Sequence, residues 1–126
     1  MHITKNFTKN ELECPCCSRC NMDPTFMEVL QQVRYDVDRP FKINSGYRCQ
    51  AHNTLVSNSP KSRHIYGMAV DISIANWSGK EIYSLLFHLT NVGPRKGYGT
   101  GLGVYPKHIH FDIRDTYNTC WIEVYK

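Results

Sequence analysis

Two short segments, residues 68–74 and 108–114, constrain the fold most, because each alternates apolar and polar side chains. Successive side chains on a strand point to opposite faces of the sheet. In "HIHFDIR" the apolar Ile109, Phe111 and Ile113 fall on one face, opposite His108, His110, Asp112 and Arg114. In "MAVDISI" Asp71 shares a face with small residues. If the two strands pair, one face is core and the other gathers histidine and aspartate.

The sequence also predicts two helices. After Asp23 and Pro24, a cap followed by a proline at the first helical position, apolar residues recur at helical spacing until Pro40. Residues 78–81 form a capping box and open a second helix, which Gly93 and Pro94 are expected to stop. A short helical turn is expected over 50–56, with further strands over 41–45, 101–105 and 120–125.

The order of these elements indicates the fold class. Strands and helices do not alternate as βαβ units, which predicts an α+β domain with a small antiparallel sheet and helices on one side. The 126 residues contain no repeat and no Gly/Ser linker, so a single domain over 1–126 is expected. We expect a monomer.

Charge and hydropathy argue against two classes of partner. The net charge is +4, but its basic residues are scattered, so nucleic acid is not an expected partner. Membrane insertion is not expected either, because no stretch approaches the roughly 20 apolar residues of a membrane span. The polar start lacks the apolar core of a signal peptide, so synthesis in the cytoplasm is expected.

One interpretation of the polar strand face is that it forms a metal site. A catalytic zinc commonly has three protein ligands and one open position, and His64, Asp71 and one histidine of "HIH" would supply such a set. A carboxylate among apolar strand neighbours is costly unless a cation or hydrogen bonds compensate it. The alternative is that each residue has an ordinary role, such as a satisfied histidine or an aspartate that caps a turn.

The motifs together resemble a known family. "SGYRCQAHN" at 45–53, "SRHIYGMAVDI" at 62–72 and "GVYPKHIHFDIR" at 103–114 are similar to the successive motifs of the zinc D-alanyl-D-alanine carboxypeptidase-like peptidases, especially small phage endolysins. The likeness covers most of the chain and implies the hedgehog/DD-peptidase-like fold. Hedgehog signalling domains share this scaffold and include members that are not working peptidases, so the fold does not guarantee catalysis.

The resemblance implies a set of site residues. The zinc ligands would be His64, Asp71 and His110, and Arg48 would hold a substrate carboxylate or carbonyl oxygen through its planar donor fork. Arg48 could instead be a surface arginine that closes a turn. Outside the ligands, Ser62 and Asp112 are candidates for supporting contacts, and Asp112 could orient a ligand histidine.

The general base departs from the family's commoner arrangement. Related carboxypeptidases often carry an acidic residue three positions before the last histidine ligand, where this chain has Lys107. His108 is the candidate base, since it shares the strand face of His110 and titrates in a suitable range. Its alternative role is that of a hydrogen-bond donor in the transition state.

The resemblance also suggests a substrate and a location. The substrate would be a peptidoglycan stem peptide, cut at a bond that involves a D-amino acid: D-Ala–D-Ala, the cross-link, or L-Ala–D-Glu. A phage enzyme of this kind would be made in the host cytoplasm and reach the bacterial wall through holin-dependent release or on the virion. The rival function is a non-catalytic binding module on the same zinc scaffold.

The segment "CPCCSRC" packs four cysteines into seven residues. Cys14, Cys17 and Cys20 have the spacing of a structural zinc site, if Cys16 or a distant cysteine completes the tetrahedron. Disulfides formed after release, or reduced thiols, are the competing states. A nucleophilic cysteine is not expected, because no base is paired with the cluster.

Overall fold

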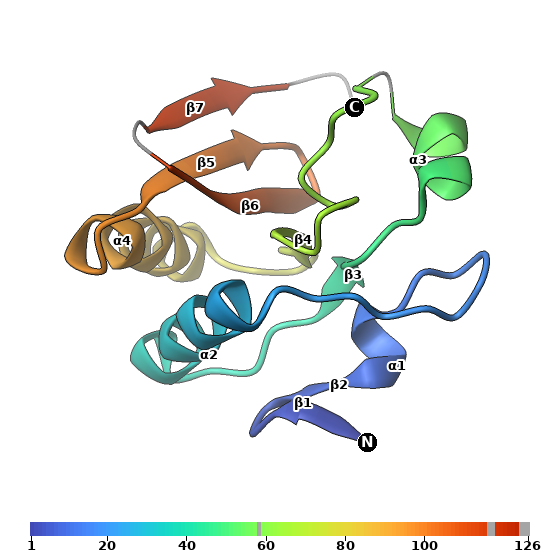
Figure 1. Cartoon of the computed structure of the whole chain (residues 1–126). Helices are drawn as coiled ribbons and strands as arrows, with labels where there is room; N and C mark the ends of the chain where they lie inside the picture. The colour runs from blue at the N-terminus through green and yellow to red at the C-terminus, as the bar shows by residue number, and fades with distance from the viewer. Residues whose placement is uncertain (58, 116–117, 124–126) are drawn as a thin grey trace.

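A five-stranded sheet forms the centre of the molecule in the computed structural model, which describes residues 1–57, 59–115 and 118–123. The strand order is β3-β4-β6-β5-β7, with bounds Ile43–Ser45, Ala69–Ser73, His108–Arg114, Gly99–Val104 and Thr119–Ile122 (Figure 1). Neighbouring strands are antiparallel except β5 and β7, which are parallel. The α+β class with a small, chiefly antiparallel sheet is confirmed.

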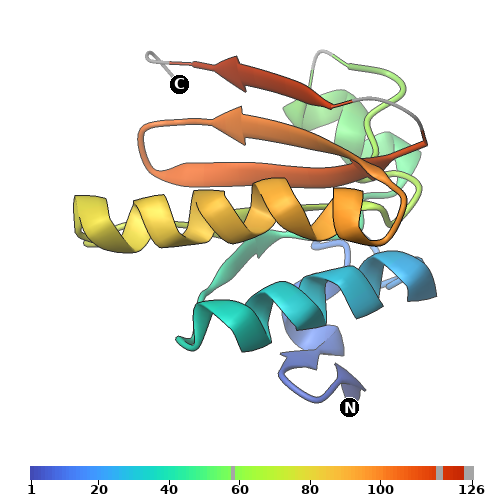
Figure 2. The same cartoon turned by 90° about the vertical axis from the view of Figure 1, so that its left-hand side faces the viewer.

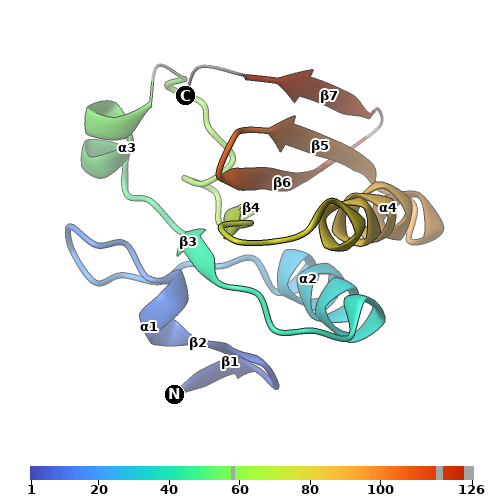
Figure 3. The ribbon, with the colours of Figure 1, turned by 180° about the vertical axis from the view of Figure 1, so that it is seen from behind.

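The two long helices cover one face of this sheet. Helix α2 (Pro24–Val37) and helix α4 (Gly79–Arg95) lie side by side, and α4 runs along the strands (Figure 2). Helix α3 (Gln50–Val56) lies on the opposite side, as the view from behind also shows (Figure 3). The side of the sheet that carries the polar face is therefore left free of long helices.

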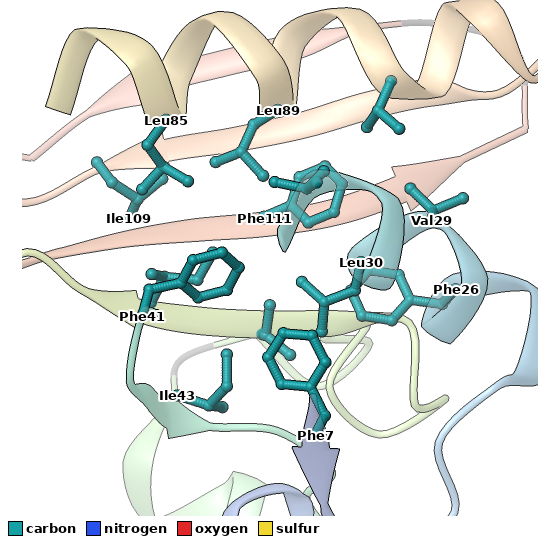
Figure 4. Packing of buried hydrophobic residues seen from close by; sticks show 14 of the residues in the cluster. Phe7, Phe26, Val29, Leu30, Phe41, Ile43, Leu85, Leu89, Ile109 and Phe111 are labelled. Carbon is teal, nitrogen blue, oxygen red and sulfur yellow. The ribbon is translucent and has the colours of Figure 1, made fainter. Parts of the chain in front are cut away.

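The core fills the space between the sheet and the two long helices. Phe111 and Ile109 of β6 pack toward Leu85 and Leu89 of α4. Leu30 of α2 belongs to the same core cluster (Figure 4). All five side chains are fully buried. Burial of this size stabilises by about 1.5–3 kcal/mol per large apolar side chain. The predicted apolar face of residues 108–114 is thus the face that binds the helices.

An N-terminal hairpin and a short helix were not predicted. Strands β1 (His2–Thr4) and β2 (Phe7–Thr8) pair, and α1 (Lys9–Leu12) follows at once. A capping box explains the start of α1: the Glu11 carboxylate accepts hydrogen bonds from the backbone N–H and the hydroxyl of Thr8. The spacing of Thr8 and Glu11 is a sequence signal that could have revealed this helix.

Helix α4 runs past its expected stop. Gly93 and Pro94 lie within it, and it ends at Arg95. The carbonyl of Gly93 accepts hydrogen bonds from Lys96 and Tyr98, and Gly97 adopts a φ of 86°. A glycine in the left-handed region is a common helix stop, so the break comes at Gly97. None of the described helices is both long and apolar enough to cross a bilayer.

Most other bounds agree with the expectations to within two residues. Helix α2 begins at Pro24 behind the Asp23 cap, whose carboxylate accepts from the Phe26 N–H. The expected strand over 120–125 appears as Thr119–Ile122, and residues 124 and 125 lie outside the described part of the chain.

Candidate metal centre

His64 lies in the turn that precedes β4, and its ring is buried. Its Nδ1 is 2.7 Å from the carbonyl oxygen of Gly46. Because a carbonyl can only accept, Nδ1 carries the proton and Nε2 keeps a lone pair. Nε2 has no hydrogen-bond partner among the described residues, although it is 3.4 Å from Oδ1 of Asp71. Two electron-rich atoms therefore face each other across a short gap.

Strand pairing brings the third group to the same point. Asp71 of β4 lies directly opposite His110 of β6, and Nδ1 of His110 is 3.2 Å from Oδ1 of Asp71. On the far side of the ring, Nε2 of His110 is 2.7 Å from Oδ2 of Asp112. A carboxylate accepts hydrogen bonds, so the proton belongs on Nε2 and the lone pair of Nδ1 points to Asp71.

These three residues fit a divalent cation. Ligand atoms of His64, Asp71 and His110 all lie within 4.8 Å of one another, and His64 Nε2 has no hydrogen-bond partner in the part of the chain that the structure describes. Two imidazoles and a carboxylate are a donor set that zinc favours, and three protein ligands leave a position open. The structure thus brings together all three residues expected from the sequence.

The site also holds charge without an ion. Burial would raise the pKa of Asp71, but the adjacent imidazoles of His110 and His64, in their protonated forms, hold it far below its usual range. Burial likewise opposes the charge on His110, yet Asp112 and Asp71 together raise its pKa above the ordinary value. A proton and a cation therefore compete for the same atoms.

Asp112 is buried and anchored from three sides. Its carboxylate accepts from His110 and from Nε of Arg114 at 3.0 Å, while Nε of Arg63 lies 3.8 Å away. Burial tends to raise the pKa of Asp112, but His110 and Arg114 together outweigh this and keep the pKa low. A Cβ at Gly101 of β5 would lie 2.2 Å from Oδ1 of Asp112, so the glycine makes room for this carboxylate.

Arg48 lines the same space but is already engaged. Its Nη2 is 3.1 Å from Oδ2 of Asp71, and its Nε is 3.1 Å from Oγ of Ser45. Nη1 lies 3.4 Å from the Asn53 side chain. Burial lowers the pKa of Arg48 from its ordinary value, although the group remains charged near neutrality. Arg48 is therefore largely buried and contacts an expected ligand.

Ser62 supports the turn rather than the ion. Its hydroxyl accepts from the backbone N–H of His64 at 3.3 Å. Gly67, in the same turn, has a φ of 68°, and a Cβ there would lie 2.0 Å from the carbonyl oxygen of Asn21. The glycine is thus required by the close approach of the chain before α2.

His108 faces the cavity beside these groups. Its ring stacks on Tyr105, with centroids 4.3 Å apart and planes 11° from parallel. Burial lowers the pKa of His108. The Tyr105 hydroxyl in turn accepts from Nε1 of Trp121 at 2.9 Å. Lys107, at the position where an acidic residue was expected from the family resemblance, is exposed and does not line the cavity.

The cavity has a volume of about 410 Å³ and a cationic lining. Four basic side chains and two carboxylates line it, together with His64, His108 and His110. The basic residues are Arg48, Lys61, Arg63 and Arg114. Anionic groups would be attracted to such a cleft.

Sequence reasoning missed several residues of this lining. Trp121 reaches the cleft because β7 pairs in parallel with β5 and sets residue 121 beside Gly103, where a Cβ would lie 2.6 Å from the indole. No local pattern indicates that pairing. The alternation along residues 108–114 predicted the correct strand face for Arg114 but no role for it. Tyr105 lies within the quoted motif at 103–114, and no role was predicted for it either.

The cysteines gather elsewhere. Cys14 and Cys17 lie with Cys49, and their Sγ atoms are within 4.8 Å of one another. Cys20, expected in this group, packs instead against the main core.

Comparison with known proteins identifies the family of this chain. The family model for M15 peptidases matches residues 5–112, whereas no curated protein matches the chain. A similar solved structure is the L-Ala D-Glu endopeptidase ChiX of Serratia marcescens, with 20% identity and a TM-score of 0.55. That match covers 74% of this chain and 80% of the other, and it shows a shared fold. The chain belongs to the M15 peptidase family.

Proposed function

We propose that this protein is a zinc-dependent peptidase that hydrolyses amide bonds in peptidoglycan stem peptides. The observation that carries the proposal is the convergence of His64 Nε2, Asp71 and His110 Nδ1. The first of these atoms is buried and has no hydrogen-bond partner among residues 1–57, 59–115 and 118–123. Family membership supports it independently, because an M15 peptidase is a hydrolase of this general class.

His64, Asp71 and His110 would hold the zinc ion. When bound, zinc supplies a Lewis acid that polarises a carbonyl and lowers the pKa of water. Around it, the main-chain carbonyl of Gly46 and the carboxylate of Asp112 fix the two imidazoles in the tautomers that present lone pairs. Arg48 holds the free oxygen of Asp71.

His108 is the proposed proton acceptor. It lines the cavity on the same strand face as His110, and its stacking on Tyr105 fixes the plane of the imidazole. A base must take the proton of the attacking water and return it to the leaving amine. Since Lys107 is exposed and outside the cleft, His108 is the better placed of the two to do so.

The cationic lining favours an anionic peptide. Stem peptides carry free carboxylates, and Arg48, with a planar donor fork, suits such a group. We propose L-Ala–D-Glu as the first bond to test, because the ChiX enzyme of similar fold is named for it. The D-Ala–D-Ala bond and the cross-link are the alternatives, so either a carboxypeptidase or an endopeptidase would satisfy the wider proposal.

The resemblance to small endolysins suggests a biological setting. We propose that the protein is a phage or prophage wall hydrolase, made in the host cytoplasm and released to the wall when a holin opens the membrane. Lysis of host cells on co-expression with a holin, and no lysis with His64→Ala, is the expected result.

The decisive experiment is digestion of isolated peptidoglycan by the purified, zinc-loaded protein. New free amines that disappear with chelator support the peptidase, and mass spectrometry of the muropeptides identifies the bond. His64→Ala and His110→Ala are the matched inactive variants. Binding to the wall without cleavage would instead support a non-catalytic module, the reading favoured by Lys107 in place of an acidic residue.

A further inference from the structure

A second group of metal-binding side chains lies outside the cleft. The Sγ atoms of Cys14, Cys17 and Cys49 are all within 4.8 Å of one another. Cys16 adds a fourth sulfur, 3.7 Å from Sγ of Cys49. Cys14 and Cys49 are buried, whereas Cys16 and Cys17 are exposed. None of these four residues lines the peptidase cavity.

Two of the sulfur separations match those of a tetrahedral metal site. With zinc–sulfur bonds of about 2.3 Å, the sulfurs of a tetrahedron lie roughly 3.8 Å apart. Cys14 and Cys16 are each 3.7 Å from Cys49. A disulfide would bring one pair to about 2.05 Å. Cys49 also touches Cys17, so it has three sulfur neighbours, and a disulfide can use one.

The surroundings favour thiolates at this point. The backbone N–H of His52 points to Sγ of Cys49 at 3.4 Å, and the N–H of Cys49 points to Sγ of Cys14 at 3.5 Å. An N–H that points to sulfur stabilises the thiolate, which is the form that binds a metal. Thiolates this close together repel one another unless a cation joins them.

A basic side chain adds to this environment. Arg19 lies close enough to Cys17 to interact with its sulfur. A zinc ion with four thiolates carries a net charge of about −2, so a neighbouring guanidinium lowers the cost of the complex. The turn that presents the sulfurs is closed by a backbone bond from Ser18 to the carbonyl of Cys14.

We propose that Cys14, Cys16, Cys17 and Cys49 bind a structural zinc ion that joins the N-terminal loop to the segment over 46–49. Cys20 takes no part. The proposal does not depend on peptidase activity, because its ligands and those of the cleft are different residues.

The site would hold residues that the cleft needs. Arg48 precedes Cys49 in the chain and contacts Asp71, and the carbonyl of Gly46 accepts from His64. The N–H of Tyr47 donates to the carbonyl of Leu12, which already ties this segment to the N-terminal part. A zinc ion would add a second, stronger link between the same two segments.

Elemental analysis of the full-length protein, purified without chelator, tests the proposal. We expect Cys49→Ser and Cys16→Ser each to lose about one equivalent of zinc relative to the wild type. Cys20→Ser and Cys120→Ser are matched controls that keep it. His110→Ala should lose the cleft ion and retain the thiolate ion. After cobalt exchange, sulfur-to-metal charge-transfer absorption should appear in the wild type and in His110→Ala.

Three results would overturn the proposal. They are full zinc retention by Cys16→Ser, rapid reaction of all four thiols in the native, zinc-supplied protein, or a mass that shows disulfides among them. Circular dichroism identifies a Cys49→Ser protein that fails to fold, and the exposed Cys16 then gives the decisive variant. An inactive protein with a thiolate-bound ion would refute the peptidase alone.

Discussion

Asp112 and His110 lie two residues apart on β6, and Oδ2 of the aspartate is 2.7 Å from Nε2 of the imidazole, on the ring edge opposite Asp71. Because Asp112 is buried, this contact is shielded from solvent. The strand thus supplies an expected ligand together with the group that orients it.

Asp112→Asn should weaken zinc binding in the cleft about 10–100-fold, since the amide no longer holds a protonated Nε2 with a charged acceptor. Competition with a chromogenic chelator measures the affinity, and kcat and KM are compared at saturating zinc. The control is Asp115→Asn, an exposed carboxylate just beyond β6. Unchanged zinc affinity in Asp112→Asn would show that the contact does not position the ligand.

His108→Ala should lower kcat about 10²–10⁴-fold while the zinc content stays constant, because a lost proton acceptor costs about that much. Turnover of a defined muropeptide and elemental analysis give the two readouts. His2→Ala, at an exposed position in β1, is the control. Near-normal turnover with full zinc would reject His108 as the base.

Arg48→Lys should raise KM for an anionic peptide about tenfold or more, because an ammonium cannot serve Asp71 and a substrate oxygen with one planar fork. Initial rates over a range of muropeptide concentrations measure it. Arg34→Lys on α2 leaves the cleft intact and serves as the control. If Arg48→Lys loses zinc but keeps the KM of the wild type, the role of Arg48 is only to hold Asp71.

Gly67→Ala should destabilise the protein by several kcal/mol. A residue with a Cβ at positive φ costs about 1–2 kcal/mol, and here the added carbon also meets a main-chain oxygen. Gly97 provides the comparison, because its φ is also positive but a Cβ there meets no atom within 4 Å. Urea unfolding of Gly67→Ala and Gly97→Ala separates the cost of the positive φ, which both variants share, from the cost of the clash at position 67. Equal losses would contradict the packing of residues 21 and 67.

Glu81 should contribute stability that depends on pH. Its carboxylate accepts from the N–H of Ser78 and pairs with Arg39, and the Ser78 hydrogen bonds lower its pKa. A lowered folded-state pKa gives stability that is present above the unfolded value of 4.5 and lost as the pH falls through the folded value. Glu81→Gln should therefore be less stable than the wild type at pH 7, with a difference that shrinks in acid.

Chemical denaturation of both proteins at several pH values measures this effect. The control is Glu28→Gln, at an exposed position on α2. A difference between Glu81→Gln and the wild type that is the same at pH 7 and pH 3 would show that the charge of Glu81 makes no contribution.

The sequence predicts the parts of this molecule that depend on local patterns. Alternation along residues 108–114 separated Phe111 from His110 correctly, and caps located both long helices. The geometry of the cleft depends on register, since Asp71 meets His110 only when β4 and β6 pair as they do. Long-range contacts decide the rest: Trp121 reaches the cleft through a parallel strand pairing, and Cys49 contacts Cys14, 35 residues away.

The two expected histidine ligands, His64 and His110, differ in how easily a mutation can disturb their tautomers. Nδ1 of His64 relies on a main-chain oxygen, which belongs to Gly46 and depends on the path of the backbone rather than on a side chain. Nε2 of His110 relies on a side chain, which a single codon change can abolish. In a diverging lineage, the tautomer of His64 would outlast many substitutions, and drift toward an inactive scaffold would be expected to begin at Asp112.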